Sequence, residues 1–333
     1  MLVRSSGVRG SIIPIIILLL LCSWLLVLYS HQHHLQWDLL PFLFTPDQEP
    51  PVEVVVASTR AEDTLWVHRF LPRWARSIYV VDNPRARLTV PENKGREAMV
   101  YLTHIVNNYD TLAETTVFVH ASRFAWHNDN RDYDLLPALH QLRLDYVQES
   151  GYVNLRCVQV LGCPAEIRPH IDAASDWARS IGSAPIGDGS GNSRALTTKE
   201  IYKAAFEELM PGVDVPQQVG VSCCSQFAVS RKAVRSRSRE DYVRWRDWLL
   251  ETSLPDDLSG RVFEYMWHII FGKEAVYCPS AADCYCKLFG ECGLKCQEMQ
   301  CEGRYILPKY SNLPEGWPQF GYAGEDRNFT GLL

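Results

Sequence analysis

The sequence predicts an α/β fold, in which a mostly parallel sheet is flanked by helices and preceded by a single N-terminal transmembrane helix. Short β-branched runs alternate with stretches of helical periodicity. A long uncharged apolar run stands near the start of the chain, and ten of the 11 cysteines follow it. The position of the cysteines indicates a domain in an oxidising compartment, with a Cys-rich, disulfide-stapled C-terminal tail.

The apolar run spans residues 11–30. As a helix, roughly twenty residues at about 1.5 Å each cross a hydrocarbon core of about 30 Å. A cleaved signal peptide is the alternative, but it usually has an apolar region of about 7–15 residues and a small-x-small site, which residues 28–30 do not provide. Arg4 and Arg9 precede the run and favour a cytoplasmic N-terminus over residues 1–10. We therefore expect a single-pass type II membrane protein that faces the Golgi or endoplasmic-reticulum lumen or the cell surface.

The remainder of the chain divides by composition. Residues 31–51 are rich in proline and are interpreted as a stem. A lumenal domain is expected over residues 52–318, with a Cys-rich segment at 278–301 and a C-terminal tail at 319–333. The chain carries 33 Lys+Arg against 39 Asp+Glu, a net charge of -6. This balance argues against a nucleic-acid partner, because nucleic-acid-binding proteins present basic surfaces.

The first half of the domain alternates expected strands and helices. Residues 52–58, 77–81 and 115–120 are rich in β-branched residues, as in strands buried on both faces. Helical periodicity at residues 61–73 and 96–109 separates them. This order predicts a parallel sheet with right-handed crossovers. In such sheets ligands bind at the carboxyl ends of the strands, where polar residues follow each of these runs.

Later elements are less regular. An extended segment is expected at residues 152–155 and a β-rich run at 219–230, and helices are expected at residues 135–148, 198–210, 239–251 and 261–271. Residues 162–193 lack periodicity, and we interpret them as a loop over the site.

The cysteines beyond the apolar run are all disulfide candidates, since their even number suits an oxidising compartment. They are Cys157, Cys163, Cys223, Cys224, Cys278, Cys284, Cys286, Cys292, Cys296 and Cys301. A structural zinc site is the alternative for the crowded segment, although it contains no pair of C-x2-C knuckles. The sequence leaves the pairing open. Asn328 begins an Asn-x-Thr sequon and is a candidate for N-glycosylation.

Several common catalytic motifs do not occur in the sequence. G-x-G-x-x-G, the P-loop, the nucleophile elbow G-x-S-x-G and H-E-x-x-H are all missing. The sequence therefore gives no motif support for a classical dehydrogenase, a P-loop enzyme, an α/β-hydrolase or an HExxH metalloprotease.

The candidate site residues stand instead at strand ends and helix starts. Asp82 follows the second expected strand and can accept hydrogen bonds from a ligand or cap a turn. Asn93, Gly95 and Glu97 precede or begin a helix, where glycine permits close approach and a carboxylate suits the helix dipole. A capped turn is the alternative function of these three residues.

A second group of candidates follows the third expected strand. His120, His127 and Asp129 combine imidazole and carboxylate groups that can ligate Mn²⁺ or Mg²⁺, with His120 and Asp129 as the metal candidates, or act as a base. Hydrogen bonding within the protein is the alternative. Glu264 lies in an otherwise apolar helix, so it either points into a cleft or pairs with Arg261.

Longer motifs resemble a known family. The runs VVVAS, IYVVDNP, ENKGREAMVYLTHIVNNYDTL, TTVFVHASRFAWHND, CCSQFAVSRKAVRSRSREDYVRW, SGRVFEYMWHIIFG and CPSAADCYCKLFGECGL occur in this order. Together they resemble a mostly fungal family of uncharacterised proteins, domain of unknown function 3431, over residues 51–318. The family name supplies no activity.

A more distant similarity suggests a function. A strand ending in VVDN, an N-x-G at a helix start and a third strand ending in polar residues resemble the Rossmann-like, nucleotide-sugar half of glycosyltransferase-A folds. The runs at residues 226–231 and 264–267 resemble the acceptor half. The resemblance implies that the nucleotide-sugar pocket contains Thr59, Asp82, Asn93, Gly95 and Glu97. The segment beginning at His120 replaces the Asp-x-Asp metal motif that such enzymes usually carry.

These observations lead to the hypothesis of a membrane-anchored, glycosyltransferase-like enzyme. It would transfer a sugar from a nucleotide sugar to a hydroxyl of a glycan or a small molecule, with Mn²⁺ or Mg²⁺ as the candidate cofactor. Glu264, Asp129 and His127 are the candidate catalytic residues. A non-catalytic lumenal or cell-surface binding protein is the first alternative. A tailoring enzyme of a fungal secondary-metabolite pathway is the second.

Overall fold

The structure is a computed structural model that describes residues 51–172, 186–187, 193–194, 196–304 and 312–330. All of these belong to one unit, Glu49–Leu333. None of the helices within the described ranges is both long and apolar enough to cross a bilayer. The expected cytoplasmic N-terminus, transmembrane run and nearly all of the stem lie outside the described residues, as does much of the expected loop at 162–193.

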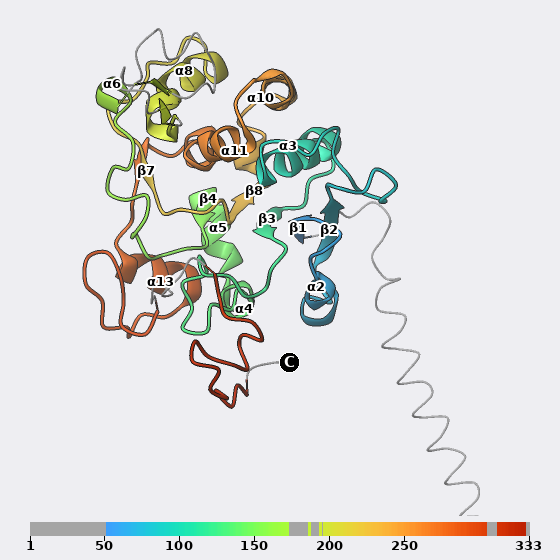
Figure 1. Ribbon diagram of the computed structural model, residues 1–333, viewed down its shortest axis with the longest axis vertical. Helices are drawn as coiled ribbons and strands as arrows, with labels where there is room; N and C mark the ends of the chain where they lie inside the picture. Colours follow the sequence, from blue (N-terminus) through green and yellow to red (C-terminus); the bar gives the residue numbers. More distant parts are fainter. Residues whose placement is uncertain (1–50, 173–185, 188–192, 195, 305–311, 331–333) are drawn as a thin grey trace, which may run out of the picture. The chain divides into compact units, whose positions relative to one another are not determined.

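A five-stranded sheet with the order β2-β1-β3-β8-β4 forms the centre of the domain (Figure 1). Its strands are β1 (Val52–Ser58), β2 (Ala75–Val80), β3 (Thr115–His120), β4 (Tyr152–Asn154) and β8 (Phe227–Ser230). β1 pairs in parallel with β2 and β3, which confirms the parallel arrangement predicted for the first three strands. β8 runs antiparallel to both β3 and β4.

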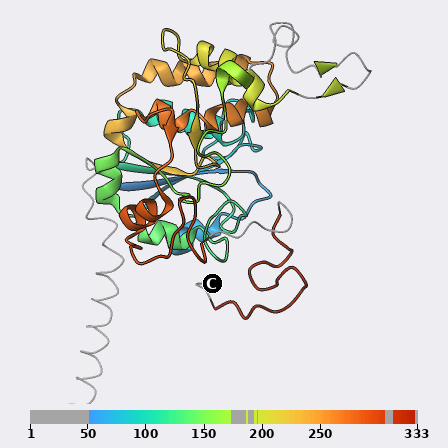
Figure 2. The ribbon, with the colours of Figure 1, turned by 90° about the vertical axis from the view of Figure 1, so that its left-hand side faces the viewer.

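The sheet separates two hydrophobic layers because successive side chains of a strand point to opposite faces. Val55 belongs to one cluster, and Val54 and Val56 belong to the other. The sheet accordingly lies between two layers of helices (Figure 2). The first layer contains α3 (Glu97–Asn108), α8 (Thr198–Leu209), α10 (Arg239–Glu251), α11 (Asp256–Glu264) and α12 (Trp267–Ile270). The second contains α2 (Leu65–Phe70), α4 (Leu136–Gln141), α5 (Leu144–Ser150) and α13 (Ala281–Phe289).

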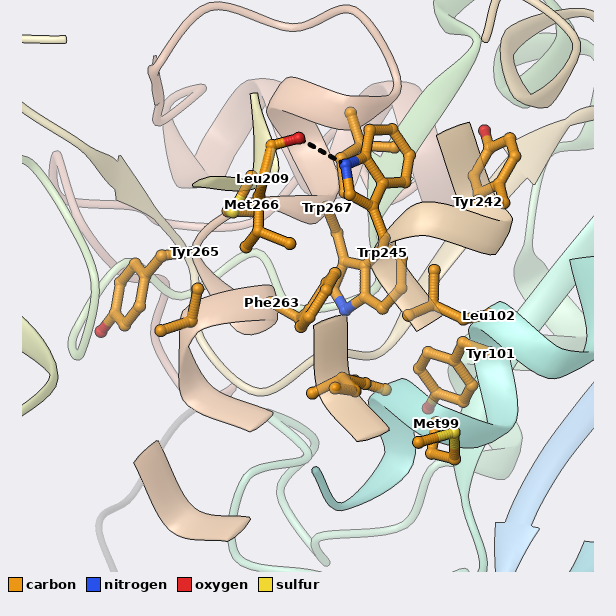
Figure 3. Close-up of a cluster of buried hydrophobic side chains, with 14 of the residues drawn as sticks. Met99, Tyr101, Leu102, Leu209, Tyr242, Trp245, Phe263, Tyr265, Met266 and Trp267 are labelled. Atoms are coloured by element: carbon orange, nitrogen blue, oxygen red, sulfur yellow. Dashed lines mark hydrogen bonds between the residues drawn. The ribbon is translucent and has the colours of Figure 1, made fainter. Parts of the chain in front are cut away.

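The first layer has an aromatic interior (Figure 3). Trp245 of α10 is buried and donates its indole N–H to the backbone oxygen of Leu209 at 2.7 Å, which satisfies the last turn of α8. Trp267 packs against Phe263 and Tyr101 with ring centroids 5.4 and 5.9 Å apart. These contacts join α10 to α8, and α12 to both α11 and α3.

Two expected helices are wrong in their extent. The helix expected at 135–148 is two helices, because Leu142 and Arg143 adopt non-helical backbone angles between α4 and α5. The helix expected at 261–271 begins earlier, after Pro255, and ends at Glu264 before a separate short helix. Two aspartates in its first turn suit the helix dipole and explain the earlier start.

Other expected elements differ mainly at their ends. The helix expected at 61–73 is confined to α2, whereas the strand expected at 115–120 and the helix expected at 239–251 agree with β3 and α10. The β-rich run at 219–230 contains two separate strands, β7 (Gly220–Val221) and β8, and β7 pairs with β9 (Val276–Tyr277). The remaining short elements are α6 (Pro169–Asp172), β5 (Ile186–Gly187), β6 (Ser193–Arg194) and α9 (Arg231–Val234).

A basic run at residues 231–239, directly after β8, caps the C-terminal end of α3. Arg239 donates to the backbone oxygen of Val106 at 2.9 Å, and Arg235 donates to those of Tyr109 and Asp110 at 3.2 and 2.7 Å. These carbonyls lack partners within the helix, and the helix dipole favours positive charge beside them. The run is therefore explained by the packing of the domain.

Five disulfides use all ten cysteine candidates, which confirms the disulfide prediction and leaves none of these thiols for zinc. Two of them, Cys157–Cys284 and Cys163–Cys278, join distant segments and fasten the Cys-rich region to the domain. The other three close short loops: Cys223–Cys224, Cys286–Cys292 and Cys296–Cys301.

Candidate active site

A cavity of about 880 Å³ opens at the carboxyl ends of β1, β2 and β3. Ser58 and Thr59 line it from β1, Val81 from the end of β2, and His120 from the end of β3. The start of α3, the end of α11 and the Cys223–Cys224 turn complete the wall. This is the edge of the sheet at which α/β proteins bind ligands.

Glu264 is the carboxylate whose acidity is most altered in this cavity. Its side chain is 15% exposed, its Oε1 accepts a 2.8 Å hydrogen bond from the backbone N–H of Cys224, and its Oε2 lies 3.7 Å from Nε of Arg261. Burial, assisted by the charge of Glu97, raises the pKa of Glu264 to about 7. A carboxyl group with this pKa exchanges a proton readily at neutral pH.

Two glycines bring Glu264 and Glu97 into the same cavity. Gly95 has a φ of +66°, and its N–H donates to Oδ1 of Asp256 at 3.2 Å in the first turn of α11. A Cβ atom on Gly260 would lie 2.9 Å from the backbone oxygen of Gly95, so only glycine permits this approach of α11 to the start of α3.

Two histidines form a pair at the end of β3. Nδ1 of His120 and Nε2 of His127 are 3.0 Å apart. Burial lowers the pKa of His127 well below its usual value, and the charges of His120 and Arg156 act in the same direction. His127 is therefore neutral near pH 7. The backbone N–H of His120 also donates to the side-chain oxygen of Gln226 at 3.2 Å, which joins the end of β3 to the residue before β8.

Most of the residues selected from the sequence line this one cavity, namely Thr59, Asn93, Glu97, His120, His127 and Glu264. The sequence left open whether Glu264 points into a cleft or pairs with Arg261. It does both, since it lines the cavity and its Oε2 lies 3.7 Å from Nε of Arg261. Thr59 holds Glu62 in place, because its N–H and hydroxyl donate to that carboxylate at 2.7 and 2.9 Å.

Three of the selected residues are used elsewhere. Asp82 accepts the backbone N–H of Arg60 at 2.8 Å, in agreement with its alternative role as a turn residue. Gly95 makes the helix contact described above and does not line the cavity. Asp129 is buried, and its Oδ2 accepts the backbone N–H groups of Cys157 and Val158 at 2.8 and 3.0 Å.

Some cavity residues were missed by the sequence analysis. Arg96, Leu161, Trp126 and the Cys223–Cys224 pair all line the wall. Adjacent cysteines are the one sequence signal that points to an unusual local structure. Leu161 and Arg96 give no such signal, because both have positive φ angles that depend on their surroundings.

The described residues preassemble no group of three free protein ligands for Mn²⁺ or Mg²⁺. Within the described ranges, Cys223, Cys224 and Glu264 form a group of donors close enough to hold a metal, but the two cysteines share a disulfide and offer no thiolate. The Asp129 carboxylate is occupied by two backbone N–H groups. Mg²⁺ is commonly held by one or two carboxylates together with substrate phosphates and waters, so the Mn²⁺ or Mg²⁺ cofactor stays a prediction.

Asn328, the candidate for glycosylation, lies in the tail and is exposed. Its backbone N–H donates to Oδ1 of Asp326 at 2.8 Å, and Asp326 is also bridged to Phe320. N-glycosylation at this position stays a prediction.

Comparison with known proteins gives a family but no activity. A family model described as a protein of unknown function (DUF3431) matches residues 54–287. No curated protein matches the chain. No solved structure matches it either.

Proposed function

The chain belongs to the DUF3431 family, and from the chemistry of its cavity we propose that it transfers a sugar from a nucleotide sugar to a hydroxyl acceptor. The observation that carries this proposal is Glu264, a carboxyl group with a pKa of about 7 in a cavity at the carboxyl ends of three parallel strands. Such a group suits the removal of a proton from an alcohol at neutral pH.

In the proposed reaction Glu264 acts as the general base. The acceptor hydroxyl gives its proton to the carboxylate of Glu264 while its oxygen forms a bond to the anomeric carbon of the donor. The bond between that carbon and the diphosphate oxygen breaks, and the electron pair leaves with the nucleoside diphosphate. A single displacement of this kind inverts the configuration at the anomeric carbon.

Two arginines support the proposal because the leaving group is an anion. Arg96 and Arg261 line the same cavity as Glu264. A guanidinium group can donate two parallel hydrogen bonds to phosphate oxygens, and its charge stabilises the negative charge that develops as the diphosphate departs. In this proposal Arg96 and Arg261 stabilise the departing diphosphate. The described residues preassemble no divalent cation site that would do so.

The strand order also supports the proposal. Three parallel strands end at the cavity, and β8 inserts antiparallel between β3 and β4. This order resembles the arrangement expected for a nucleotide-sugar-binding half joined to an acceptor-binding half. Ligands in open α/β sheets lie outside the carboxyl ends of such strands.

We further propose that the domain works in an oxidising compartment as part of a membrane-anchored protein. The five disulfides support this compartment, because disulfides are rare in reducing ones. The anchor in this proposal is the uncharged run at residues 11–30.

The test is to incubate the purified full-length chain with a panel of nucleotide sugars and alcohol acceptors, with and without Mn²⁺. We expect release of a nucleoside diphosphate that depends on the acceptor and does not require Mn²⁺. Glu264→Gln should keep donor binding and reduce turnover by about 10²- to 10⁴-fold, the usual contribution of a general base. Glu251→Gln, at an exposed position of α10, is the matched control and should behave as wild type.

Two outcomes would decide against the proposal. If no nucleotide sugar raises the melting temperature or is consumed, the chain does not use this class of donor. If donors bind equally to wild type and Glu264→Gln but neither protein turns them over, the non-catalytic binding protein becomes the better explanation.

A further inference from the structure

An exposed leucine and a disulfide form an apolar surface in the cavity wall, which we call the ledge and define as Leu161, Cys223 and Cys224. All three residues line the cavity. They belong to one local structure, because the backbone N–H of Cys223 donates to the backbone oxygen of Leu161 at 3.2 Å. Cys223 is only 4% exposed, so Leu161 and the half-buried Cys224 supply the accessible apolar atoms of the ledge.

The backbone of the ledge adopts a conformation that side chains rarely tolerate. Leu161 has a φ of +67° and Cys224 a φ of +95°, and neither is glycine. Gly162 is needed between the two segments, because a Cβ atom there would lie 1.9 Å from the backbone oxygen of Val221. Such conformations cost energy and are concentrated at ligand-binding and catalytic sites.

The exposure of Leu161 is a second indication that something binds here. This side chain is 46% exposed, although it projects from a tightly packed turn into a cavity. Single exposed leucines are common on protein surfaces, but this one lines the same cavity as the disulfide, and its backbone is hydrogen-bonded to that of Cys223. A ligand that covered Leu161 and Cys224 would remove apolar area from water.

The Cys223–Cys224 disulfide does not serve to join distant parts of the chain. It links adjacent residues, whereas Cys157–Cys284 spans a separation of 127 residues. Its sulfur atoms and a carboxylate oxygen of Glu264 lie within 4.8 Å of one another. The ledge therefore places an apolar surface directly beside an ionisable oxygen.

We infer that the ledge is a binding subsite for a cyclic alcohol, whose C–H face packs on Leu161 and the disulfide while one hydroxyl reaches Glu264. A ring suits this surface because it presents an apolar face and a hydroxyl in a fixed relation, and so loses little conformational freedom on binding. The inference rests on the proposed function only in identifying this alcohol as the acceptor. Binding itself requires no nucleotide sugar.

The test measures binding of defined probes to the full-length chain by saturation-transfer NMR. The probes are cyclohexanol and methyl β-D-glucopyranoside, with glycerol as a polyol that lacks a ring face. Both ring alcohols should bind, and glycerol should not. Leu161→Ala should weaken ring binding by about tenfold, because it removes most of the apolar side chain from the contact. Leu65→Ala is the matched control, since Leu65 is 72% exposed and does not line the cavity.

A second pair of variants tests the disulfide. Cys223→Ala/Cys224→Ala should also weaken ring binding, whereas Cys286→Ala/Cys292→Ala, which removes another short-loop disulfide, should leave it unchanged. Circular dichroism identifies any variant that has lost its fold. If the Cys223→Ala/Cys224→Ala variant is unfolded, the result with Leu161→Ala alone tests the inference. The inference is overturned if wild type binds neither ring alcohol, or if a folded Leu161→Ala variant binds them as wild type does.

The results also separate this inference from the proposed function. Ring alcohols that bind at the ledge in a chain that uses no nucleotide sugar support the subsite and contradict the transferase. Conversely, transfer with an acceptor KM that Leu161→Ala leaves unchanged supports the transferase and contradicts the subsite.

Discussion

The backbone N–H of Cys224 donates a 2.8 Å hydrogen bond to Oε1 of Glu264. This bond favours the charged carboxylate and lowers its pKa, while burial favours the neutral acid and raises it. Burial prevails, since the pKa of Glu264 is raised to about 7. The disulfide-closed turn therefore moderates the acidity of the proposed base and also holds its orientation.

The raised pKa of Glu264 predicts that folding stability falls as pH rises. Its usual value is 4.5 and its folded value about 7, so between these values the folded state holds a proton that the unfolded state has released. This contribution is complete below about pH 4.5 and is lost as pH rises towards about 7. The difference corresponds to about 3 kcal/mol of unfolding free energy.

Denaturant unfolding at pH 5 and pH 8 measures this effect. Glu264→Gln has no titrating group at this position, so its stability relative to wild type should increase between pH 5 and pH 8. Glu251→Gln, on the exposed end of α10, should show no such change. An equal stability difference between wild type and Glu264→Gln at both pH values would contradict the raised pKa.

Glu264 also illustrates which parts of the site the sequence could predict. A carboxylate within an apolar helix indicated either a cleft or an ion pair, and this follows from the local pattern alone. Its raised pKa depends first on burial by residues from other segments and then on the charge of Glu97, and the N–H of Cys224 opposes both. The strands β1 and β3 were also predictable from local sequence, because a strand that is buried on both faces consists of a nearly continuous run of apolar residues.

Asp129 and Gly95 show the opposite case. Both were selected as ligand-binding residues, yet Asp129 accepts backbone N–H groups from Cys157 and Val158, and Gly95 packs against Leu249. Their partners lie at least 28 residues away in the chain, and nothing in the sequence around either residue identifies those partners. The sequence around Asp129 and Gly95 therefore could not show that their bonds and contacts are used within the protein.

A buried ion pair between Arg123 and Asp134 predicts a large loss of stability when either partner is removed. Two hydrogen bonds of 2.9 and 2.8 Å join their side chains, which are only 8% and 7% exposed. Arg123→Ala or Asp134→Ala alone should each cost about 3–5 kcal/mol, because the remaining charge is buried without its partner. The double variant should cost less than the sum of the two.

Chemical denaturation of the four proteins of this cycle measures the coupling. The control pair is Arg143 and Asp145, whose side chains are 48% and 72% exposed. Removing either partner there should change stability by no more than about 1 kcal/mol. Additive losses at Arg123 and Asp134 would show that the pair contributes no interaction of its own.

The disulfides predict different losses of stability according to the length of chain that they enclose. Cys157→Ala/Cys284→Ala leaves the nested Cys163–Cys278 bond closed, so the ring that it opens comprises only residues 157–163 and 278–284, whereas Cys286→Ala/Cys292→Ala opens a loop with a separation of 6. By the chain-entropy relation the first bond stabilises by about 3 kcal/mol and the second by about 2 kcal/mol. Unfolding monitored by circular dichroism should give this order, and the reverse order would contradict it.

Gly95 offers the sharpest test of how the cavity is assembled. Its φ is +66°, and a Cβ atom would lie 2.6 Å from Cδ2 of Leu249, which belongs to α10. Gly95→Ala therefore adds a steric clash to the backbone cost of a positive φ, which is about 1–3 kcal/mol. The control Gly212→Ala has a φ of +81° but no atom within 4 Å of the added methyl, so it measures the backbone cost alone.

The difference between these two variants in unfolding free energy is the packing contribution at α3 and α10, and we expect Gly95→Ala to be the less stable by at least about 1 kcal/mol. Because the clash is with the Leu249 side chain, Leu249→Ala should remove the extra cost, so that Gly95→Ala causes a smaller loss in the Leu249→Ala background than in wild type. Equal losses for Gly95→Ala in both backgrounds would mean that Leu249 is not the obstacle.

Since Gly95 also bonds to Asp256 at the start of α11, Gly95→Ala should additionally shift the pKa of Glu264, whereas Gly212→Ala should leave it unchanged.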